Sequence, residues 1–193
     1  MTKHRLELFS DGVFAIVMTI LVLDLHVPED PGLRGLIDIA PALLVHAATF
    51  AAVGVLWLTH HGALARVTEI SSRALLFNLV ALFWITLLPF AARNAAARPL
   101  EPLGASLMAA CCGGFLLSAL SMRLTARSTI DDNPRLASWR RRRLAIGFGM
   151  SAANLIGAVL AWISPWFGYG AALIMIGTTA LLPSPPDVEK KVG

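Results

Sequence analysis

The chain has 193 residues, of which 56% are hydrophobic and 15% charged, and its mean hydropathy is +0.70. An average soluble domain has about 45–50% apolar and about 25% charged residues. One soluble core cannot hold so many apolar side chains, so the composition argues against a soluble enzyme, a disordered chain and a secreted disulfide scaffold. The length suits a single domain, 1–193, with about six membrane spans of roughly 20 residues each.

Apolar runs separated by polar and proline-containing segments predict an all-α membrane protein. In chain order, we expect the six transmembrane helices at about 7–27, 37–60, 73–92, 103–124, 142–163 and 166–183. The adjacent Cys111 and Cys112 lie within an apolar run, where small buried packing residues are expected in place of a disulfide. The first apolar run has an acidic motif and no small-residue cleavage site after it, so we expect no signal peptide.

The distribution of basic residues predicts the orientation of the spans. With both termini in the cytoplasm, 13 of the 16 basic residues fall on the cytoplasmic side, and only Arg34, Arg93 and Arg98 fall outside. The cytoplasmic set is Lys3, Arg5, Arg66, Arg73, Arg123, Arg127, Arg135, Arg140, Arg141, Arg142, Arg143, Lys190 and Lys191. Such an asymmetry is the positive-inside pattern of a multi-pass protein, which we expect in the inner (plasma) membrane.

The run Arg140-Arg141-Arg142-Arg143 gives the chain its strongest local charge. A basic run of this kind binds either nucleic acid or anionic lipid. Since it directly precedes a predicted span on the cytoplasmic side, we interpret it as a juxtamembrane anchor that contacts anionic lipid, and we expect no nucleic-acid partner.

The first span carries an aliphatic stripe. Ile16, Ile20 and Leu23 follow an i, i+4, i+7 spacing and fall within an arc of about 60° of a helical wheel. Gly12 continues the stripe, and Thr19 flanks it. Such a stripe is compatible with ordinary helix packing. It is also compatible with a pore wall, because symmetric copies would stack into hydrophobic rings, and narrow hydrophobic constrictions gate ions by dewetting.

Asp11 lies on nearly the opposite side of the same wheel. An ionisable group at the edge of a span needs a partner or access to water. One interpretation is a Ser10-Asp11 helix cap or a snorkelling surface acid, and the other is a polar motif buried against the subunit's own bundle. Arg5 is six residues earlier, roughly 240° away at about 100° per residue, so the two cannot pair along one continuous helix.

Several motifs of the first 90 residues resemble a known family. They are Arg5-x-x-x-Phe9-Ser10-Asp11, Val27-Pro28 after the span, Trp57-Leu58-Thr59-His60-His61 in the second span, and Asn78 and Pro89-Phe90 in the third. In order and spacing they resemble the endosomal and lysosomal potassium channel family (transmembrane protein one-seventy-five), in its prokaryotic single-repeat, six-helix form. The last three spans match in number and character only.

The resemblance implies a homotetrameric, potassium-preferring cation channel whose pore is lined by the first helix of each subunit. It implies a constriction at Ile16, further rings at Ile20 and Leu23, and a hydroxyl selectivity position at Thr19. It also implies a polar network that holds the helix ends together. The residues of that network are Arg5, Phe9, Ser10, Asp11, Trp57, His60 and Asn78.

The other polar candidates for chemistry are the pair His60-His61, His46 and Asp24. His60 and His61 point about 100° apart on a helix and have no nearby Cys or Asp to complete a set, so we expect no metal site, and one of the two joins the polar network. His46 is interpreted as a buried, hydrogen-bonded histidine. Asp24 either collects cations at the pore mouth or solvates the helix end. We expect no cofactor; potassium is the permeant ion.

Two other functions remain as alternatives. A secondary transporter or proton-coupled cation exchanger would use Asp11, His46 and His60 and would show saturable flux. A membrane enzyme would be built on His60-His61 and Asp11 and would need a clustered site and a substrate pocket. The chain shows no catalytic triad, nucleotide loop or interrupted helix pair, so the channel is favoured and no enzymatic activity is expected.

Overall fold

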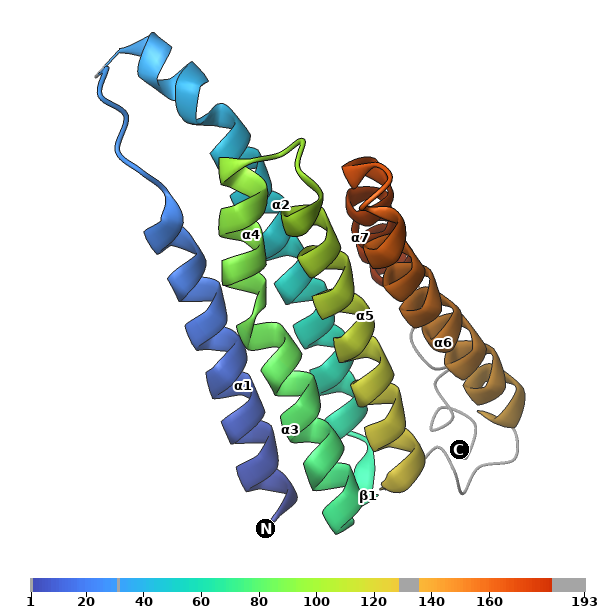
Figure 1. Ribbon diagram of the computed structural model, residues 1–193. Helices are drawn as coiled ribbons and strands as arrows, with labels where there is room; N and C mark the ends of the chain where they lie inside the picture. The colour runs from blue at the N-terminus through green and yellow to red at the C-terminus, as the bar shows by residue number, and fades with distance from the viewer. Residues whose placement is uncertain (1, 31, 129–135, 182–193) are drawn as a thin grey trace, which may run out of the picture.

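The computed structural model describes residues 2–30, 32–128 and 136–181. Its elements are helices, apart from two short strands that pair into a ribbon (Figure 1). They are α1 (Lys3–Ile20), the 3₁₀ helix η1 (Leu21–Asp24), α2 (Leu33–Leu64), β1 (Val67–Glu69), α3 (Ser72–Thr86), α4 (Leu88–Ala97), α5 (Pro102–Thr125), β2 (Arg127–Ser128), α6 (Ala137–Leu160) and α7 (Pro165–Leu181).

Five helical segments in the described part of the chain are long and apolar enough to cross a membrane, namely Lys3–Leu23, Leu33–Leu64, Ser72–Ala97, Pro102–Thr125 and Ser138–Leu160. α7 has 17 residues, the lower limit of the usual length of a span. Together they give the six helices expected from the sequence. The observed helices depart from the predicted bounds chiefly at their polar ends, because water-exposed turns such as Lys3-His4-Arg5 continue a helix beyond its apolar run.

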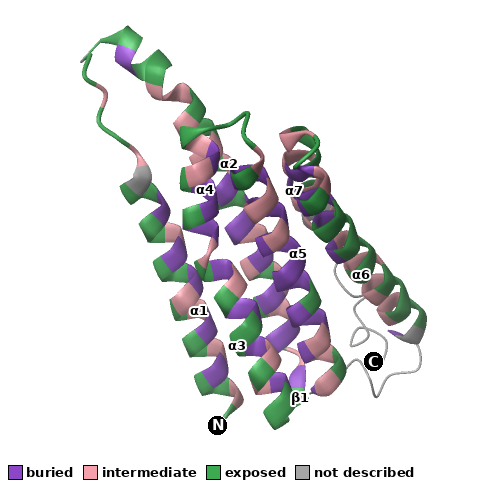
Figure 2. Cartoon of the chain, viewed as in Figure 1, coloured by how far each residue is buried: buried purple, intermediate pink, exposed green. Residues whose placement is uncertain are grey.

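Helix α5 is the central element of the bundle. It packs against α3, α4, α6 and α7, and most of its residues are buried (Figure 2). Its middle consists of small residues, 109–114, which allow neighbouring backbones to approach closely. α6 and α7 form the expected antiparallel pair, whereas α1 lies at the edge of the bundle against α2, α3 and α4 (Figure 1).

The third span is broken between α3 and α4. Pro89 has no backbone N–H, and its ring conflicts with the carbonyl of Ile85 in a continuous helix. The chain accommodates the proline with a tighter turn, in which the N–H of Leu87 donates to the carbonyl of Trp84 at 3.3 Å. The expected single helix at 73–92 is therefore two helices that continue as far as Ala97.

A two-stranded antiparallel ribbon links the end of α2 to the end of α5. β1 pairs with β2 in the register Val67 to Ser128 and Glu69 to Arg127. The prediction of purely helical structure did not include this ribbon, which is too short to show an alternating pattern. Val67 is 4% exposed and packs with Leu6, Leu64 and Met122, so the ribbon closes the apolar core at this end of the bundle.

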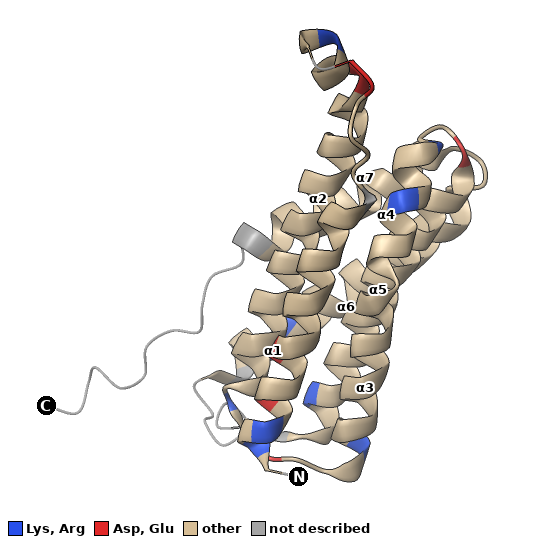
Figure 3. Cartoon of the chain, turned by 90° about the vertical axis from the view of Figure 1, so that its left-hand side faces the viewer, with Lys and Arg blue, Asp and Glu red and all other residues tan. Residues whose placement is uncertain are grey.

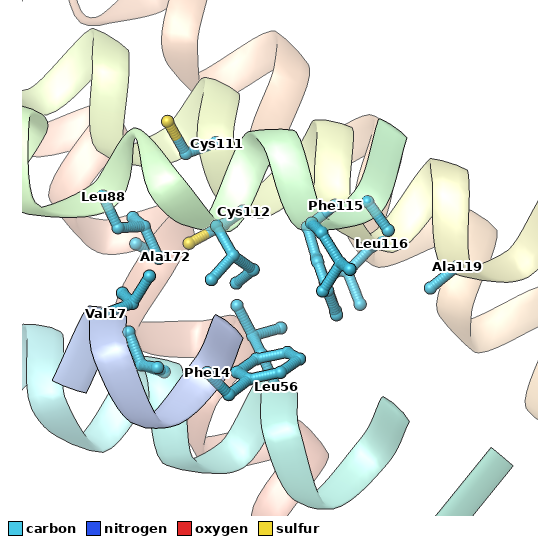
Figure 4. Packing of buried hydrophobic residues seen from close by; sticks show 14 of the residues in the cluster. Phe14, Val17, Leu56, Leu88, Cys111, Cys112, Phe115, Leu116, Ala119 and Ala172 are labelled. Carbon is cyan, nitrogen blue, oxygen red and sulfur yellow. The ribbon is translucent and has the colours of Figure 1, made fainter. Parts of the chain in front are cut away.

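The main core joins α1, α2, α3, α4, α5 and α7 (Figure 4). Phe14 of α1 belongs to this core, and its ring lies 5.8 Å from that of Phe115 in an edge-to-face contact. Cys111 and Cys112 are both buried free thiols within this core, as expected. The core therefore fixes one face of α1 tightly against its own subunit.

Lys and Arg residues gather at the end of the bundle that contains the N-terminus (Figure 3). Arg34, Arg93 and Arg98 belong to the segments at the opposite end, namely the start of α2 and the far part of α4 with its following turn. The separation by ends predicted from the sequence is therefore present in the fold. Arg135, Lys190 and Lys191, which the prediction also counted, lie outside the described residues.

We expect Gly114→Ala to destabilise the protein by about 1–3 kcal/mol through overpacking. A Cβ on Gly114 would lie 2.3 Å from Cε2 of the Trp84 ring, so α3 and α5 would have to separate. The measurement is the thermal unfolding midpoint of purified protein in detergent. Gly149→Ala is the matched control, because a Cβ there meets no atom within 4 Å and alanine favours the helix. Equal midpoints for the two variants would contradict this packing.

Candidate functional site

Helix α1, continued by the 3₁₀ helix η1, has one buried and one uncovered face. Its buried face consists of Leu6, Ser10, Phe14, Val17 and Leu21, all 3% exposed or less. The uncovered face contains the predicted stripe, with Ile16 at 59%, Ile20 at 39% and Leu23 at 76% exposed. Gly12 and Thr19 are also exposed on this helix. The stripe is therefore not used for packing within the subunit, which removes the interpretation as intrasubunit helix packing.

A buried polar cluster, formed by Ser10, His60 and Asn78, joins α1 to α2 and α3. The Nδ2 of Asn78 donates to the Ser10 hydroxyl at 3.2 Å, and its Oδ1 lies 2.9 Å from Nε2 of His60. All three residues are 1% exposed or less. Because an amide oxygen only accepts, His60 carries its proton on Nε2. Its Nδ1 is buried and has no hydrogen-bond partner among the described residues.

A second, half-buried polar cluster is formed by Asp11, Trp57 and His61. The indole N–H of Trp57 donates to Oδ1 of Asp11 at 2.8 Å, and Nδ1 of His61 lies 3.4 Å from the same oxygen. The Trp57 and His61 rings are 5.4 Å apart. The sequence left open which histidine joins the network, and the structure uses both, one in each cluster. Since each histidine faces a different cluster, the pair does not form a shared ligand site.

Ser10 and Asp11 lie inside α1, which begins at Lys3, so the helix-cap interpretation is wrong. Asp11 lies away from the aliphatic stripe and against α2, as the helical wheel predicted.

Arg5 and Phe9 do not join either cluster. Both are exposed, and Arg5 makes no hydrogen bond or ion pair within the part of the chain that the structure describes. The reason is geometric: α1 is continuous, so Arg5 and Asp11 point to different sides of it. Asp24 ends the 3₁₀ helix η1, and its side chain lies outside the described set.

Thr19 lies beside the stripe and donates its hydroxyl to the carbonyl of Ile16 at 2.8 Å. This bond uses the only proton of the hydroxyl and leaves its oxygen as an acceptor. An acceptor among exposed aliphatic side chains is the kind of group that a cation contacts.

Two side chains near α1 and α2 bind backbone carbonyls that the sequence did not predict as their partners. Nδ1 of His46 lies 3.3 Å from the carbonyl of Leu21, so this histidine is hydrogen-bonded, as expected, and joins α2 to the far end of α1. It is half-buried, so the expected full burial is wrong. Nη2 of Arg123 donates to the carbonyl of Thr59 at 3.0 Å. Both acceptors are backbone carbonyls, and no residue pattern in the sequence marks a particular carbonyl as a partner.

Residues 5–89 match the family model described as endosomal/lysosomal potassium channel TMEM175. This stretch contains α1, α2, α3 and all members of both polar clusters. The family model therefore covers less than half of the chain, and this part of the chain is similar to the TMEM175 family. The resemblance seen in the first 90 residues is thus confirmed.

The relatives include a potassium channel of Chryseobacterium sp. (strain P1-3), which is 45% identical over 91 residues, 47% of each chain. The endosomal/lysosomal proton channel TMEM175 of Rattus norvegicus is 33% identical over 114 residues, 53% of this chain and 23% of the rat protein. The alignments thus span about half the length of the bacterial relative and under a quarter of the rat one.

The likeness of fold extends over nearly the whole chain. The crystal structure of a lysosomal potassium-selective channel TMEM175 homolog from Chamaesiphon minutus superposes with a TM-score of 0.73. The match covers 93% of this chain and 96% of that one, at 23% identity. The chain is a multi-pass membrane protein with the TMEM175 channel fold.

Proposed function

We propose that the protein is a potassium-preferring cation channel, a homotetramer in which α1 of each subunit lines a central pore. The main observation that supports this proposal is the uncovered stripe Ile16–Ile20–Leu23, which lies on a helix whose opposite face is buried in the core. The names of the bacterial relatives, which are potassium channels, support the choice of ion.

In this proposal, Ile16, Ile20 and Leu23 form successive hydrophobic rings. A ring of isoleucine side chains has no group that replaces the hydration shell of an ion, so a narrow ring excludes water and closes the pore. Opening then requires the rings to widen enough to hold water. Thr19 offers an oxygen beside the Ile16 and Ile20 rings and is the proposed selectivity position, and Asp24 at the end of η1 is the proposed mouth residue.

The two polar clusters are proposed to hold α1 in place during gating. They connect the first half of α1 to α2 and α3 through short hydrogen bonds, whereas the stripe is left uncovered. Arg5 and Phe9, which are exposed on the subunit, complete the network in this proposal by contacting a neighbouring subunit.

We further propose that the protein lies in the inner (plasma) membrane and that both of its termini are on the cytoplasmic side. The basic end of the bundle supports this orientation through the positive-inside rule. Arg140 to Arg143 then face the anionic cytoplasmic leaflet as a lipid-contacting anchor.

The function is tested by potassium and sodium flux in liposomes that contain the purified protein. We expect flux that rises with the ion gradient without saturation and that is greater for potassium than for sodium. Empty liposomes and liposomes with heat-unfolded protein are the controls. Saturable flux coupled to a pH gradient would contradict the channel and favour the proton-coupled exchanger.

A further inference from the structure

A cavity of about 420 Å³ lies at the basic end of the bundle, between the ends of α2 and α5 and the start of α6. It is separate from the stripe on α1 and from both polar clusters. Its described lining contains no acidic residue and combines apolar side chains with five arginines and a tryptophan. The polar members are Arg66, Arg123, Trp139, Arg140, Arg141 and Arg143.

Three donor groups of this lining are buried and lack a hydrogen-bond partner among the described residues. They are Nε of Arg123, Nη1 of Arg143 and Nε1 of Trp139. A buried donor that is left unpaired destabilises the protein, and more so when the group is charged. Three such donors around one cavity indicate a site that is built for an acceptor carrying negative charge.

The donors are also held in position. The guanidinium of Arg123 is fixed at one end, where Nη2 donates to the carbonyl of Thr59 at 3.0 Å, while its Nε is unpaired. The guanidinium carbon of Arg143 lies 5.3 Å from the centre of the Trp139 ring, within the range of a cation–π contact. An incoming anion therefore finds donors that have already lost part of their conformational freedom.

We propose that this cavity binds a phosphate group. Phosphate presents several oxygens to converging guanidinium donors, and arginine pairs with it through two parallel hydrogen bonds. The phosphate is supplied either by the headgroup of an anionic lipid, which the apolar part of the lining would accommodate, or by a soluble phosphate ester. The site extends the surface anchor of Arg140 to Arg143 into a defined pocket, and its test does not require channel activity.

The test is isothermal titration calorimetry on the full-length protein in a neutral detergent. The lipid probes are dioctanoyl phosphatidic acid and dioctanoyl phosphatidylglycerol, and the soluble probes are glycerol 3-phosphate and inorganic phosphate. Dioctanoyl phosphatidylcholine is the zwitterionic control. Binding of the anionic lipids alone identifies a headgroup site, whereas binding of the soluble probes with similar affinity identifies a site for free phosphate. Absence of binding by all four anionic probes overturns the proposal.

Arg143→Gln is expected to weaken binding by about tenfold or more, since it removes a charged donor of the lining. Arg142→Gln is the matched control, because Arg142 is an exposed neighbour in the same run and does not line the cavity. We expect its affinity to stay within about twofold of the unaltered protein. Equal losses for the two variants would show non-specific attraction to the basic run and overturn the proposal.

Trp139→Phe provides a second variant if Arg143→Gln does not fold. It removes the unpaired indole donor and keeps an aromatic ring beneath Arg143. We expect about a threefold to tenfold loss of affinity for the phosphate probe that binds. An unchanged affinity would mean that the indole N–H does not face the ligand and would contradict the proposed pocket.

Discussion

Replacing Ile16 with Asn is expected to raise the resting potassium flux of reconstituted channels by about tenfold or more, by wetting the proposed constriction. Ile16 is 59% exposed in the subunit, so the change creates no cavity in the core and leaves the polar clusters intact. In the proposed tetramer, four amide side chains would replace four aliphatic ones in a single ring. The measurement is potassium flux into liposomes at equal amounts of folded tetramer.

Two variants separate polarity from size and position. Ile16→Val makes the ring slightly wider without adding a polar group, so a flux close to that of the unaltered protein is expected. Ala15→Asn places the same amide at an exposed neighbour about 100° away on α1, off the stripe. If Ala15→Asn raised the flux as much as Ile16→Asn does, or if Ile16→Asn had no effect, Ile16 would not form the gate.

The sequence predicted the spans well because each apolar run is close to the thickness of a bilayer. The bounds of α5, predicted as 103–124 and observed as Pro102–Thr125, are the clearest case, since proline and polar residues end the run on both sides. The break at Leu87 was missed, although Pro89 was noted, because proline is also tolerated within continuous transmembrane helices. The ribbon of β1 and β2 was missed because two or three residues carry no period.

The features of the site that follow from helical geometry could be predicted from the sequence. The features that depend on tertiary packing could not. The angle between Asp11 and the stripe follows from 100° per residue, and the structure has Asp11 on the α2 side. The division of the network into two clusters could not be predicted, because it depends on how α2 and α3 are rotated relative to α1. The basic cavity was missed for the same reason: Arg66, Arg123 and Arg143 lie far apart in the sequence and meet only through packing.

Asn78→Ala is expected to destabilise the protein by about 2–4 kcal/mol, because it leaves two buried polar groups without their partner. Asn78 is 0% exposed and joins Ser10 of α1 to His60 of α2 in the buried polar cluster. The Ser10 hydroxyl and the His60 ring stay buried when the amide is removed, so water does not replace the lost hydrogen-bond partner. The measurement is the free energy of unfolding in a titration with denaturing detergent.

Asn94→Ala is the matched control, since Asn94 lies in the same span and, within the described part of the chain, its Nδ2 donates to the carbonyl of Phe90 in its own helix. We expect a change within about 0.5 kcal/mol for this variant. Ser10→Ala and the double variant complete a thermodynamic cycle, in which the two losses should not add, because both side chains belong to one network. Additive losses, or an Asn78→Ala variant as stable as Asn94→Ala, would show that the cluster does not hold α1 to the rest of the bundle. In that case the position of the stripe would depend on the second polar cluster and on apolar contacts such as those of Phe14 and Val17.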